Sequence, residues 1–413
     1  MYRPNISGIH NCYGCGVCSI PCPVDIIDLR FNSEGFYEPY LTDPKKCVHC
    51  GMCRDVCAYT KDNTAESFKP IVSYAAWSKD KDIHKKCSSG GVGFEIAHQL
   101  LDEGYKVVGV KYNIHTKRAE HYISSTIKDL VQTIGSKYIQ SYTINAWKDL
   151  NRQDKYLITG TPCQIDSFRY YMKRMKIPEN KFILLDFFCH GVPSMLLWKK
   201  YCTDIEKKHG KITYVSWRNK WNFGWHDSWI MGINTDHANE RTNGHDNSPI
   251  INRGEETFIQ SRFSQGDKFY RLFLSDLCLG RQCYLHCKYK YANSSADVRI
   301  GDLWGKTYEK NQDGVSAAIA FTESGKELLM HTNCELKPHP FDLVAEGQMK
   351  VCPPIPSMRD KVIQSLQNPV KTIGDTVKMV DNWYKINRIE NMIIHPIDTF
   401  FRIIRRIERT FDK

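Results

Sequence analysis

The chain has 413 residues and a formal charge of +11, from 57 Lys and Arg against 46 Asp and Glu. Single hydrophobic cores rarely grow to this size, so we expect at least two domains. Hydrophobic residues make up 41% and charged residues 25%, which excludes a disordered or fibrous protein. The basic residues are scattered and no nucleic-acid-binding motif accompanies them, so we expect no nucleic-acid partner.

The sequence contains neither a secretory signal nor an apolar run of the roughly 18 residues that a spanning helix needs. We therefore expect a cytoplasmic protein. It contains 17 cysteines. Because cytosolic thiols stay reduced and these cysteines cluster tightly, metal binding is favoured over disulfides.

Residues 3–66 contain two cysteine runs typical of bacterial ferredoxins. In such pairs, three cysteines of a run bind one [4Fe–4S] cluster and the fourth binds the other cluster. One predicted ligand set is Cys12, Cys15, Cys18 and Cys57, and the second is Cys47, Cys50, Cys53 and Cys22. A zinc ribbon is the alternative, but it needs only four ligands. This segment is predicted to be a dicluster ferredoxin-like module.

Residues 70–350 alternate between strand-like and helix-like segments, which indicates a mixed α/β domain and an α+β class for the whole chain. The expected strands are 106–112, 156–159, 182–189, 213–218, 228–234, 298–302 and 317–322. The expected helices are 91–104, 163–175, 193–208 and 323–332.

Two small-residue turns are candidates for cofactor binding. Ser88-Ser89-Gly90-Gly91 precedes an expected helix, whose N-terminal N–H groups suit an anion. A plain N-cap is the alternative. Gly135-Ser136-Lys137-Tyr138 combines a cation with an aromatic ring, which suits a phosphate or a ring system.

Two further turns place a cysteine between a strand and a helix. Thr161-Pro162-Cys163-Gln164 follows one expected strand, and Cys189-His190-Gly191 follows the next. Ligands bind at the carboxyl ends of strands in open sheets, so both turns are candidates for a binding site. The dipole of the following helix should lower the pKa of the Cys163 thiol. Together with Cys283 and Cys287 these cysteines make four thiols, enough for a third cluster. The pattern of buried free cysteines fits Cys87, Cys202, Cys334 and Cys352.

In order along the chain, several segments resemble the coenzyme F420 hydrogenase/dehydrogenase beta-subunit family. They are Cys87–Gly91, Gly135–Tyr138, Gly160–Gln164, Cys189–Gly191, Arg281–Cys287 and Ala296–Gly305. The resemblance implies a flavoprotein, generally with FAD, that passes electrons between clusters, flavin and a hydride-accepting substrate. One departure is the three-residue gap between Cys283 and Cys287, where the family commonly has two, which makes Cys278 an alternative ligand.

The resemblance also implies individual roles. FAD or FMN would contact Ser88, Ser89, Gly90, Gly91, Lys137, Tyr138, Thr161 and Gln164. Lys137 would favour the anionic reduced flavin. A third [4Fe–4S] cluster between module and flavin would be held by Cys163, Cys189, Cys283 and Cys287.

The sequence leaves three functions open. The first is an iron–sulfur flavoenzyme that takes electrons from a ferredoxin-like donor and reduces a small organic substrate, with polysaccharide biosynthesis as one setting implied by stand-alone relatives. The second is an electron-transfer beta subunit of the hydrogenase/dehydrogenase type, linked to coenzyme F420, that works beside a catalytic partner subunit in a larger complex. The third is a non-enzymatic redox sensor.

Residues 216–226 combine several Trp residues with cations, a mixture that suits a planar or anionic ligand. Catalytic candidates are Lys137, Arg218 and His226. Substrate-site candidates are Arg218, Lys220 and His226. The alternative is a strand whose Trp residues fill the core while Arg218 and Lys220 stay solvated. A polar loop is expected over 236–255. Residues 351–413 are predicted to form a helical, basic tail, in which 396–411 would dock on protein or contact an anionic membrane surface.

Overall fold

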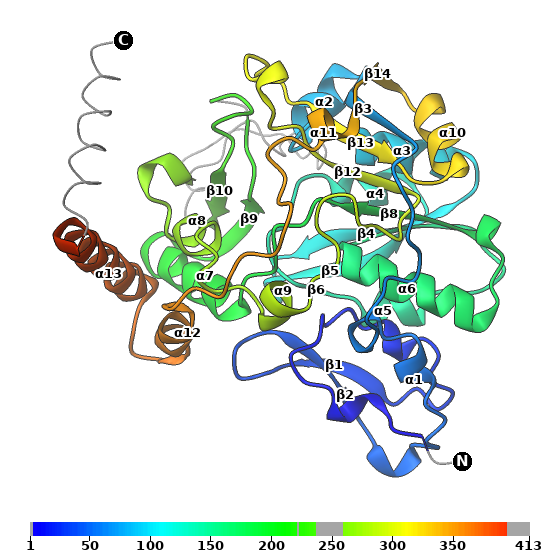
Figure 1. Ribbon diagram of the computed structural model, residues 1–413, viewed down its shortest axis with the longest axis horizontal. Coiled ribbons are helices and arrows are strands. Elements are labelled where there is room, and N and C mark those ends of the chain that lie inside the picture. The colour runs from blue at the N-terminus through cyan, green and yellow to red at the C-terminus, as the bar shows by residue number, and fades with distance from the viewer. Residues whose placement is uncertain (1–2, 221–222, 237–258, 395–413) are drawn as a thin grey trace.

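The computed structural model describes residues 3–220, 223–236 and 259–394. The N-terminal module lies below a large sheet, and a smaller sheet with the C-terminal helices lies at one side (Figure 1). Except for Asp236, the loop expected over 236–255 lies outside the described residues. The same holds for the helix expected over 396–411.

The N-terminal module consists of cysteine-bearing loops around one antiparallel hairpin. The hairpin pairs β1 (Ile27–Phe31) with β2 (Tyr37–Leu41), and a short helix, α1 (Met52–Asp55), follows. The loops pack closely on the larger domain. A Cβ on Gly14 would lie only 2.4 Å from the Gln140 side chain and 2.5 Å from the Tyr37 carbonyl, so this close approach requires glycine.

Among the described residues the largest sheet has nine strands, in the order β14-β3-β13-β12-β8-β7-β4-β5-β6. Strands β12, β8, β7 and β4 pair in parallel, whereas β3, β13 and β14 pair antiparallel. The bounds are β3 Val72–Ser78, β4 Lys106–Asn113, β5 Arg118–Ser124, β6 Ser141–Tyr142, β7 Tyr156–Thr159, β8 Phe182–Phe187, β12 Val298–Asp302, β13 Ser316–Ala320 and β14 Cys334–Pro338.

Helices cover both faces of this sheet, because neighbouring apolar residues of a strand point to opposite faces. Leu157 packs with α3 (Val92–Asp102), α4 (Ile127–Leu130) and α10 (Glu323–His331). Its neighbour Ile158 packs with α5 (Ile144–Lys148) and α6 (Pro162–Met175). Two short helices, α2 (Lys81–Lys86) and α11 (Phe341–Val344), lie against β3.

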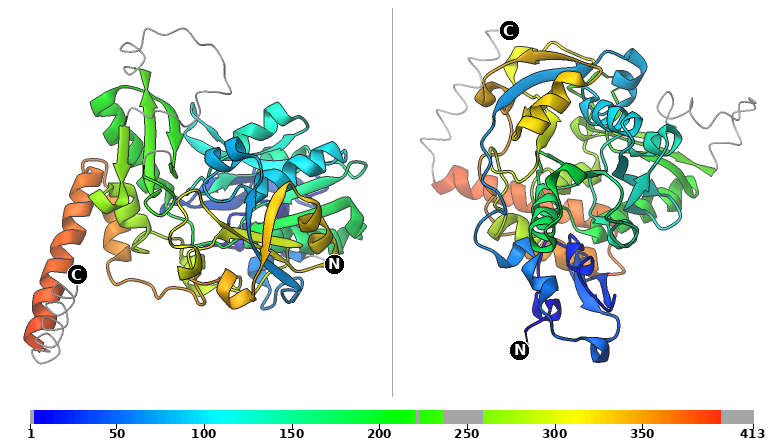
Figure 2. Two further views of the ribbon diagram at one scale, coloured as in Figure 1. Left: turned by 90° about the horizontal axis from the view of Figure 1, so that it is seen from above. Right: turned by 90° about the vertical axis from the view of Figure 1, so that its right-hand side faces the viewer.

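The smaller sheet has the order β11-β10-β9, with β9 Ile212–Ser216, β10 Ile230–Thr235 and β11 Ile259–Arg262. Its core is shared with α7 (Met195–His209), α8 (Lys268–Phe273), α9 (Arg281–Leu285), α12 (Arg359–Gln367) and α13 (Ile373–Ile394). Helix α13 projects from the body of the molecule (Figure 2). No described helix is both long and apolar enough to cross a membrane.

The expected mixed α/β architecture is confirmed. Strands β7 and β12 have the predicted bounds, and the expected helices are found within two residues as α3, α6, α7 and α10. The sequence did not predict β3, whose segment contains two alanines and alternates weakly. Its position between β13 and β14 supplies the pairing that its local sequence does not specify. The domain boundaries at 66, 70 and 350 stay predictions.

Candidate functional site

The first predicted set of cluster ligands surrounds a single small cavity. Cys12, Cys15, Cys18 and Cys57 line it, and all four are buried. Burial raises the pKa of each of these thiols, that of Cys15 to about 11. Metal charge offsets this cost because a coordinating thiol gives up its proton. The donor set therefore fits a [4Fe–4S] cluster.

The second set lies at the outer end of the module. Cys53 is buried, and its pKa is raised to about 11 by burial, with further contributions from the nearby Cys50 and Cys22. Cys22, the fourth cysteine of the first run, therefore lies with the second run. Cys47 accepts a 3.4 Å hydrogen bond from the Asn5 amide. This outer end faces solvent, since the neighbouring Val48 is 60% exposed.

Single-ion geometry is absent from the described part of the chain, where no three His, Cys, Asp or Glu side chains converge closely enough to hold one metal ion. A cubane is several ångströms across and holds its four thiolates further apart than a single ion does.

A cavity of about 650 Å³ lies at the carboxyl ends of β7 and β8. Its volume is that of a pocket for a small-molecule ligand or cofactor. It brings together predicted site residues from four separate turns: Ser88, Ser89, Gly91, Lys137, Tyr138, Thr161, Cys163, Gln164 and Cys189. The other predicted residues, Gly90, Arg218, His226, Cys283 and Cys287, are not among its lining residues.

Of the loop before α3, Ser88, Ser89 and Gly91 line the cavity, whereas Gly90 does not. Gly91 has φ +86° and forms the N-cap of α3 at the cavity wall. Gly90 instead donates its N–H to Ser316 Oγ at 2.9 Å. A Cβ on Gly90 would lie 2.3 Å from the Ala76 carbonyl, so Gly90 packs the loop on the sheet. The Gly90 N–H is used within the protein, and the predicted contact between Gly90 and a cofactor stays a prediction.

The Lys137 ammonium lies at the wall but serves its own turn. Its Nζ donates to the carbonyls of Thr133 at 2.8 Å, Ile134 at 3.0 Å and Gln132 at 3.3 Å. Lys137 therefore closes this turn while keeping a positive charge beside the cavity. The charge can still act on a bound cofactor, because Coulomb interaction needs no direct hydrogen bond.

Thr161 and Gln164 form a capping box that starts α6. The Thr161 N–H donates to Gln164 Oε1 at 2.8 Å, and both residues line the cavity. This cap places Cys163 in the first helical turn. The expected lowering of its pKa by the helix dipole is wrong for the free thiol. Burial raises the pKa of Cys163 well above its usual value and outweighs the lowering by the Thr161 hydroxyl.

The four thiols predicted for a third cluster come together. Cys15, Cys189 and Cys283 are close enough to Cys163 to raise its pKa further. Cys163 and Cys287 pack against the same aromatic pair, Tyr13 and Tyr289. These four thiols therefore lie beside the first cysteine set of the module, Cys12, Cys15, Cys18 and Cys57, which we call the inner cysteine set.

Two other cysteines, Cys278 and Cys352, have surroundings that the sequence did not predict. Cys278, the alternative ligand, is fully buried in the core of the smaller sheet, where its Sγ lies 3.7 Å from the Leu272 carbonyl. Cys352, expected to be a buried free cysteine, is half-buried and donates to the Cys287 carbonyl at 3.1 Å. The segment after residue 350 therefore contacts the four cysteines predicted to hold a third cluster, through Cys287. The local sequence could not indicate this contact.

The cations of residues 216–226 are buried, contrary to the alternative that kept them solvated. Arg218 pairs with Asp302 at 3.0 Å, and its guanidinium lies 4.6 Å from the ring centroid of Trp229 and 5.1 Å from that of Trp304. These two Trp residues and Asp302 line the cavity, although the sequence had not singled them out as site residues. Arg218 thus supports an aromatic wall rather than facing a ligand.

Lys220 and His226 also lie behind the wall. Lys220 donates to the Ser89 carbonyl at 2.8 Å, and burial lowers its pKa to about 8. The ring of His226 lies 3.3 Å from the Tyr308 carbonyl through Nε2. Both residues can position the wall, whereas neither is among the residues that line the cavity.

Tyr13 joins the two parts of the molecule. It lines the small cavity formed by Cys12, Cys15, Cys18 and Cys57, and it also lines the large cavity. The cysteine run of the module therefore reaches the wall of the large cavity directly. A module with two cysteine sets, joined to a domain with one large cavity, defines an iron–sulfur type of redox protein.

Comparisons with known proteins agree with this class. The model described as "4Fe-4S dicluster domain" matches residues 11–61. The two models of the coenzyme F420 hydrogenase/dehydrogenase beta subunit match residues 73–148 for its N-terminal part and 153–338 for its C-terminal part. Together these two cover well over half of the chain. The protein belongs to the coenzyme F420 hydrogenase/dehydrogenase beta-subunit family.

Two individual proteins are similar to the chain. An uncharacterized protein of Methanocaldococcus jannaschii is 25% identical over 189 residues, which are 38% of this chain and 52% of the relative. The chain thus spans about half the length of this relative. A chain of the xenon-derivatized F420-reducing [NiFe] hydrogenase complex from Methanosarcina barkeri matches with a TM-score of 0.44 and 18% identity, over 78% of this chain and 95% of that chain.

Proposed function

We propose that this protein is an electron-transfer beta subunit of the hydrogenase/dehydrogenase type. It exchanges single electrons with a ferredoxin-like protein or a catalytic partner subunit through [4Fe–4S] clusters. A flavin in the large cavity couples these electrons to two-electron chemistry on a small organic molecule. The family assignment favours this function over a stand-alone flavoenzyme.

The observation that carries the proposal is the place of Tyr13 in the walls of both cavities. Electrons pass efficiently only between centres that lie close together, and the Tyr13 side chain is shared by the walls of both cavities. Cys163 lies on the same aromatic cluster as Tyr13. A third cluster on Cys163, Cys189, Cys283 and Cys287 would complete the route from module to cavity.

The chemistry of the large cavity fits a flavin. Tyr138 stacks on Trp229 with ring centroids 5.2 Å apart, and Trp229 stacks on Trp304 at 6.1 Å, so a group of aromatic rings that suits a ring system lines the cavity. The N-terminus of the 11-residue helix α3 opens on the same cavity and suits a phosphate. FAD and FMN share both features, so the proposal includes either.

Composition after anaerobic purification tests the proposal. We expect one extractable FAD or FMN per chain and about twelve irons, since each cubane contributes four. About eight irons would remove the third cluster and keep the module. Absence of both flavins from a protein that carries its irons would contradict the proposed function.

The three candidate functions differ in the partner subunit and the cofactors that they require. Co-purification with a catalytic subunit supports the proposed role, whereas reoxidation of the reduced flavin by a small substrate without a partner supports the stand-alone enzyme. Clusters without flavin would support a redox sensor. The roles in polysaccharide biosynthesis and at a membrane surface, and the cytoplasmic location, stay predictions.

A further inference from the structure

The turn of the module hairpin, residues 32–36, contacts the start of α7 and helix α12. The Ser194 hydroxyl donates to the Glu34 carbonyl at 2.6 Å, and the Met195 N–H donates to the Gly35 carbonyl at 3.0 Å. The Gln367 side chain of α12 donates to the Ser33 carbonyl at 2.8 Å. The hairpin turn therefore has hydrogen-bond partners on both α7 and α12.

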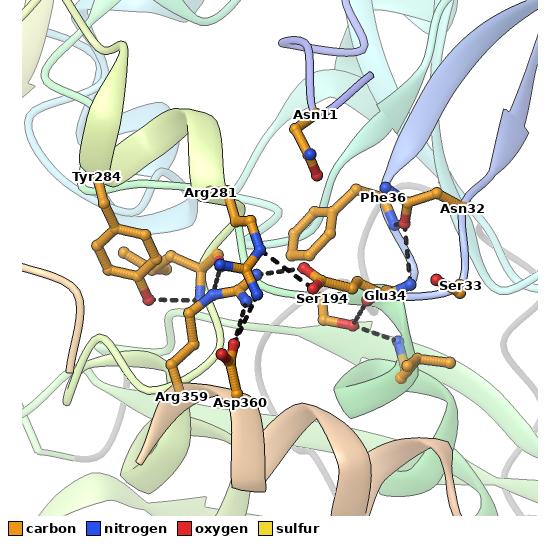
Figure 3. A network of polar contacts seen from close by, with 12 residues as sticks. Asn11, Asn32, Ser33, Glu34, Phe36, Ser194, Arg281, Tyr284, Arg359 and Asp360 are labelled. Carbon is orange, nitrogen blue, oxygen red and sulfur yellow. Dashed lines mark hydrogen bonds and ion pairs between the residues drawn. The ribbon is translucent and has the colours of Figure 1, made fainter. Parts of the chain in front are cut away.

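Two arginines hold the carboxylate of Glu34 (Figure 3). Arg281 Nε donates to Oε1 at 3.2 Å, and Arg359 Nη2 donates to Oε2 at 2.5 Å. The Arg359 side chain is fully buried, while that of Glu34 is 20% exposed. A buried guanidinium that loses its carboxylate partner is costly, so this contact is more than a surface ion pair.

The same arginines connect the hairpin to the turn that carries Cys283. Arg281 is the first residue of α9, two positions before Cys283. Arg359 begins α12 and donates through Nε to the Leu279 carbonyl at 3.0 Å. Asp360 accepts from both arginines, at 2.7 Å from Arg281 and 3.1 Å from Arg359. Three segments, the hairpin, α9 and α12, thus meet at one set of ion pairs.

We propose that this set, which we name the Glu34 clamp (Glu34, Arg281, Arg359 and Asp360), fixes the iron–sulfur module relative to the turn that carries Cys283. Helix α12 thereby positions the centres between which electrons move. The four residues are positioning residues, because none of them belongs to the predicted cysteine sets or lines the large cavity. The inference rests on the proposed electron transfer from module to cavity.

Hydrogen exchange of the holoprotein tests the clamp directly. In Glu34→Gln and Arg359→Gln we expect roughly tenfold faster exchange at the Met195 amide and over residues 32–36, because these report opening of the hairpin interface. The double variant should open by less than the product of the two single effects, because the two changes share the Glu34–Arg359 contact. The matched control is Asp381→Asn, which breaks the 2.6 Å Arg271–Asp381 ion pair between α8 and α13, away from the module. Unchanged exchange in Glu34→Gln would overturn the clamp.

The rate of electron transfer from the clusters to the flavin is the second test, because a purely structural role of the Glu34 clamp would leave this rate unchanged. Reduction of the bound flavin by a reduced ferredoxin, which delivers electrons to the clusters, should slow on the order of tenfold in the clamp variants, because small displacements cost large factors in rate. Direct photoreduction of the flavin should keep its wild-type rate. Faster exchange with an unchanged cluster-to-flavin rate would overturn the positioning role. A wild-type protein without flavin would contradict the proposed function instead, and the exchange measurement would then decide the clamp.

Discussion

The hydroxyl oxygen of Ser167 lies 3.4 Å from the Sγ of Cys15. Ser167 belongs to α6, one helical turn after Cys163, so a single helix contacts a ligand of the inner cysteine set and carries a thiol of the third set. The same oxygen accepts from the Ala58 N–H, at 3.4 Å, directly after Cys57. The inner set, rather than the solvent-facing one, is therefore the end of the module that meets the larger domain.

Removing this hydroxyl should change the inner cluster without removing it. In Ser167→Ala we expect unchanged iron content and a midpoint potential more negative on the order of tens of millivolts, because a hydrogen bond to a ligand thiolate favours the reduced cluster. Redox titration followed by electron paramagnetic resonance measures the shift. Thr203→Ala, at an exposed position of α7, is the control, since that hydroxyl bonds only its own helix at the Lys199 carbonyl among the described contacts. A potential equal to wild type would contradict the role of Ser167.

The choice between Cys283 and Cys278 as cluster ligand has a direct test. Cys283→Ala should lower the iron content by about four atoms per chain, while Cys278→Ala should leave it unchanged. The reason is that Cys283 lies beside Cys189 and Cys287, whereas Cys278 is packed in an apolar core. Iron analysis of the anaerobically purified variants decides the matter, and the reverse result would transfer the ligand role to Cys278.

Arg218 should be essential for the aromatic wall. Arg218→Met leaves the Asp302 carboxylate without its partner, so we expect a loss of about 3 kcal/mol or more in unfolding free energy and weaker flavin retention. The irons of the module should remain. Arg262→Met is the matched control, because Arg262 also pairs with a carboxylate, Asp227, and lies over a ring, Phe223, but on the surface. Equal flavin loss in both variants would count against a specific role of Arg218.

Gly90 should be required for packing rather than for cofactor contact. A Cβ there would meet the backbone of Ala76 and Ser316, so Gly90→Ala is expected to cost roughly 2–3 kcal/mol of stability. Gly8→Ala, with no atom within 4 Å of the added Cβ, should be near neutral. Thermal unfolding of both variants measures the difference. A stable Gly90→Ala protein that fails to retain flavin would instead support the predicted phosphate-binding role.

His121 should make the protein sensitive to mild acid. Burial lowers its pKa from 6.5 to about 4 in the folded state, with the ring 3.1 Å from the Thr159 carbonyl and against Trp147. The unfolded chain therefore binds the proton first, and stability falls as pH drops from about 6.5 towards 4, by up to about 3 kcal/mol. Thermal midpoints measured between pH 7 and 5 should fall less in His121→Gln than in wild type. The exposed His115→Gln should follow the wild-type curve.

The sequence by itself determined the cysteine chemistry and most of the parallel sheet. Cluster ligands follow a fixed spacing within a short loop, so the cysteines from Cys12 to Cys57 can be divided into two sets by their spacing alone. Strand β7 is a short run of mostly apolar residues, and β12 contains two β-branched residues, so local composition suffices to find them. The turns after β7 and β8 were recognised for the same reason, because strand, small residues and helix follow one another locally.

Only the tertiary structure decided what those residues face. Whether Arg218 is solvated or buried depends on Trp229, Trp304 and Asp302, which come from two other segments of the chain. Likewise Glu34 meets Arg359 across 325 positions. Contacts of this kind have no local signature, because burial and partner choice are properties of the packed chain and not of the residues that flank each position.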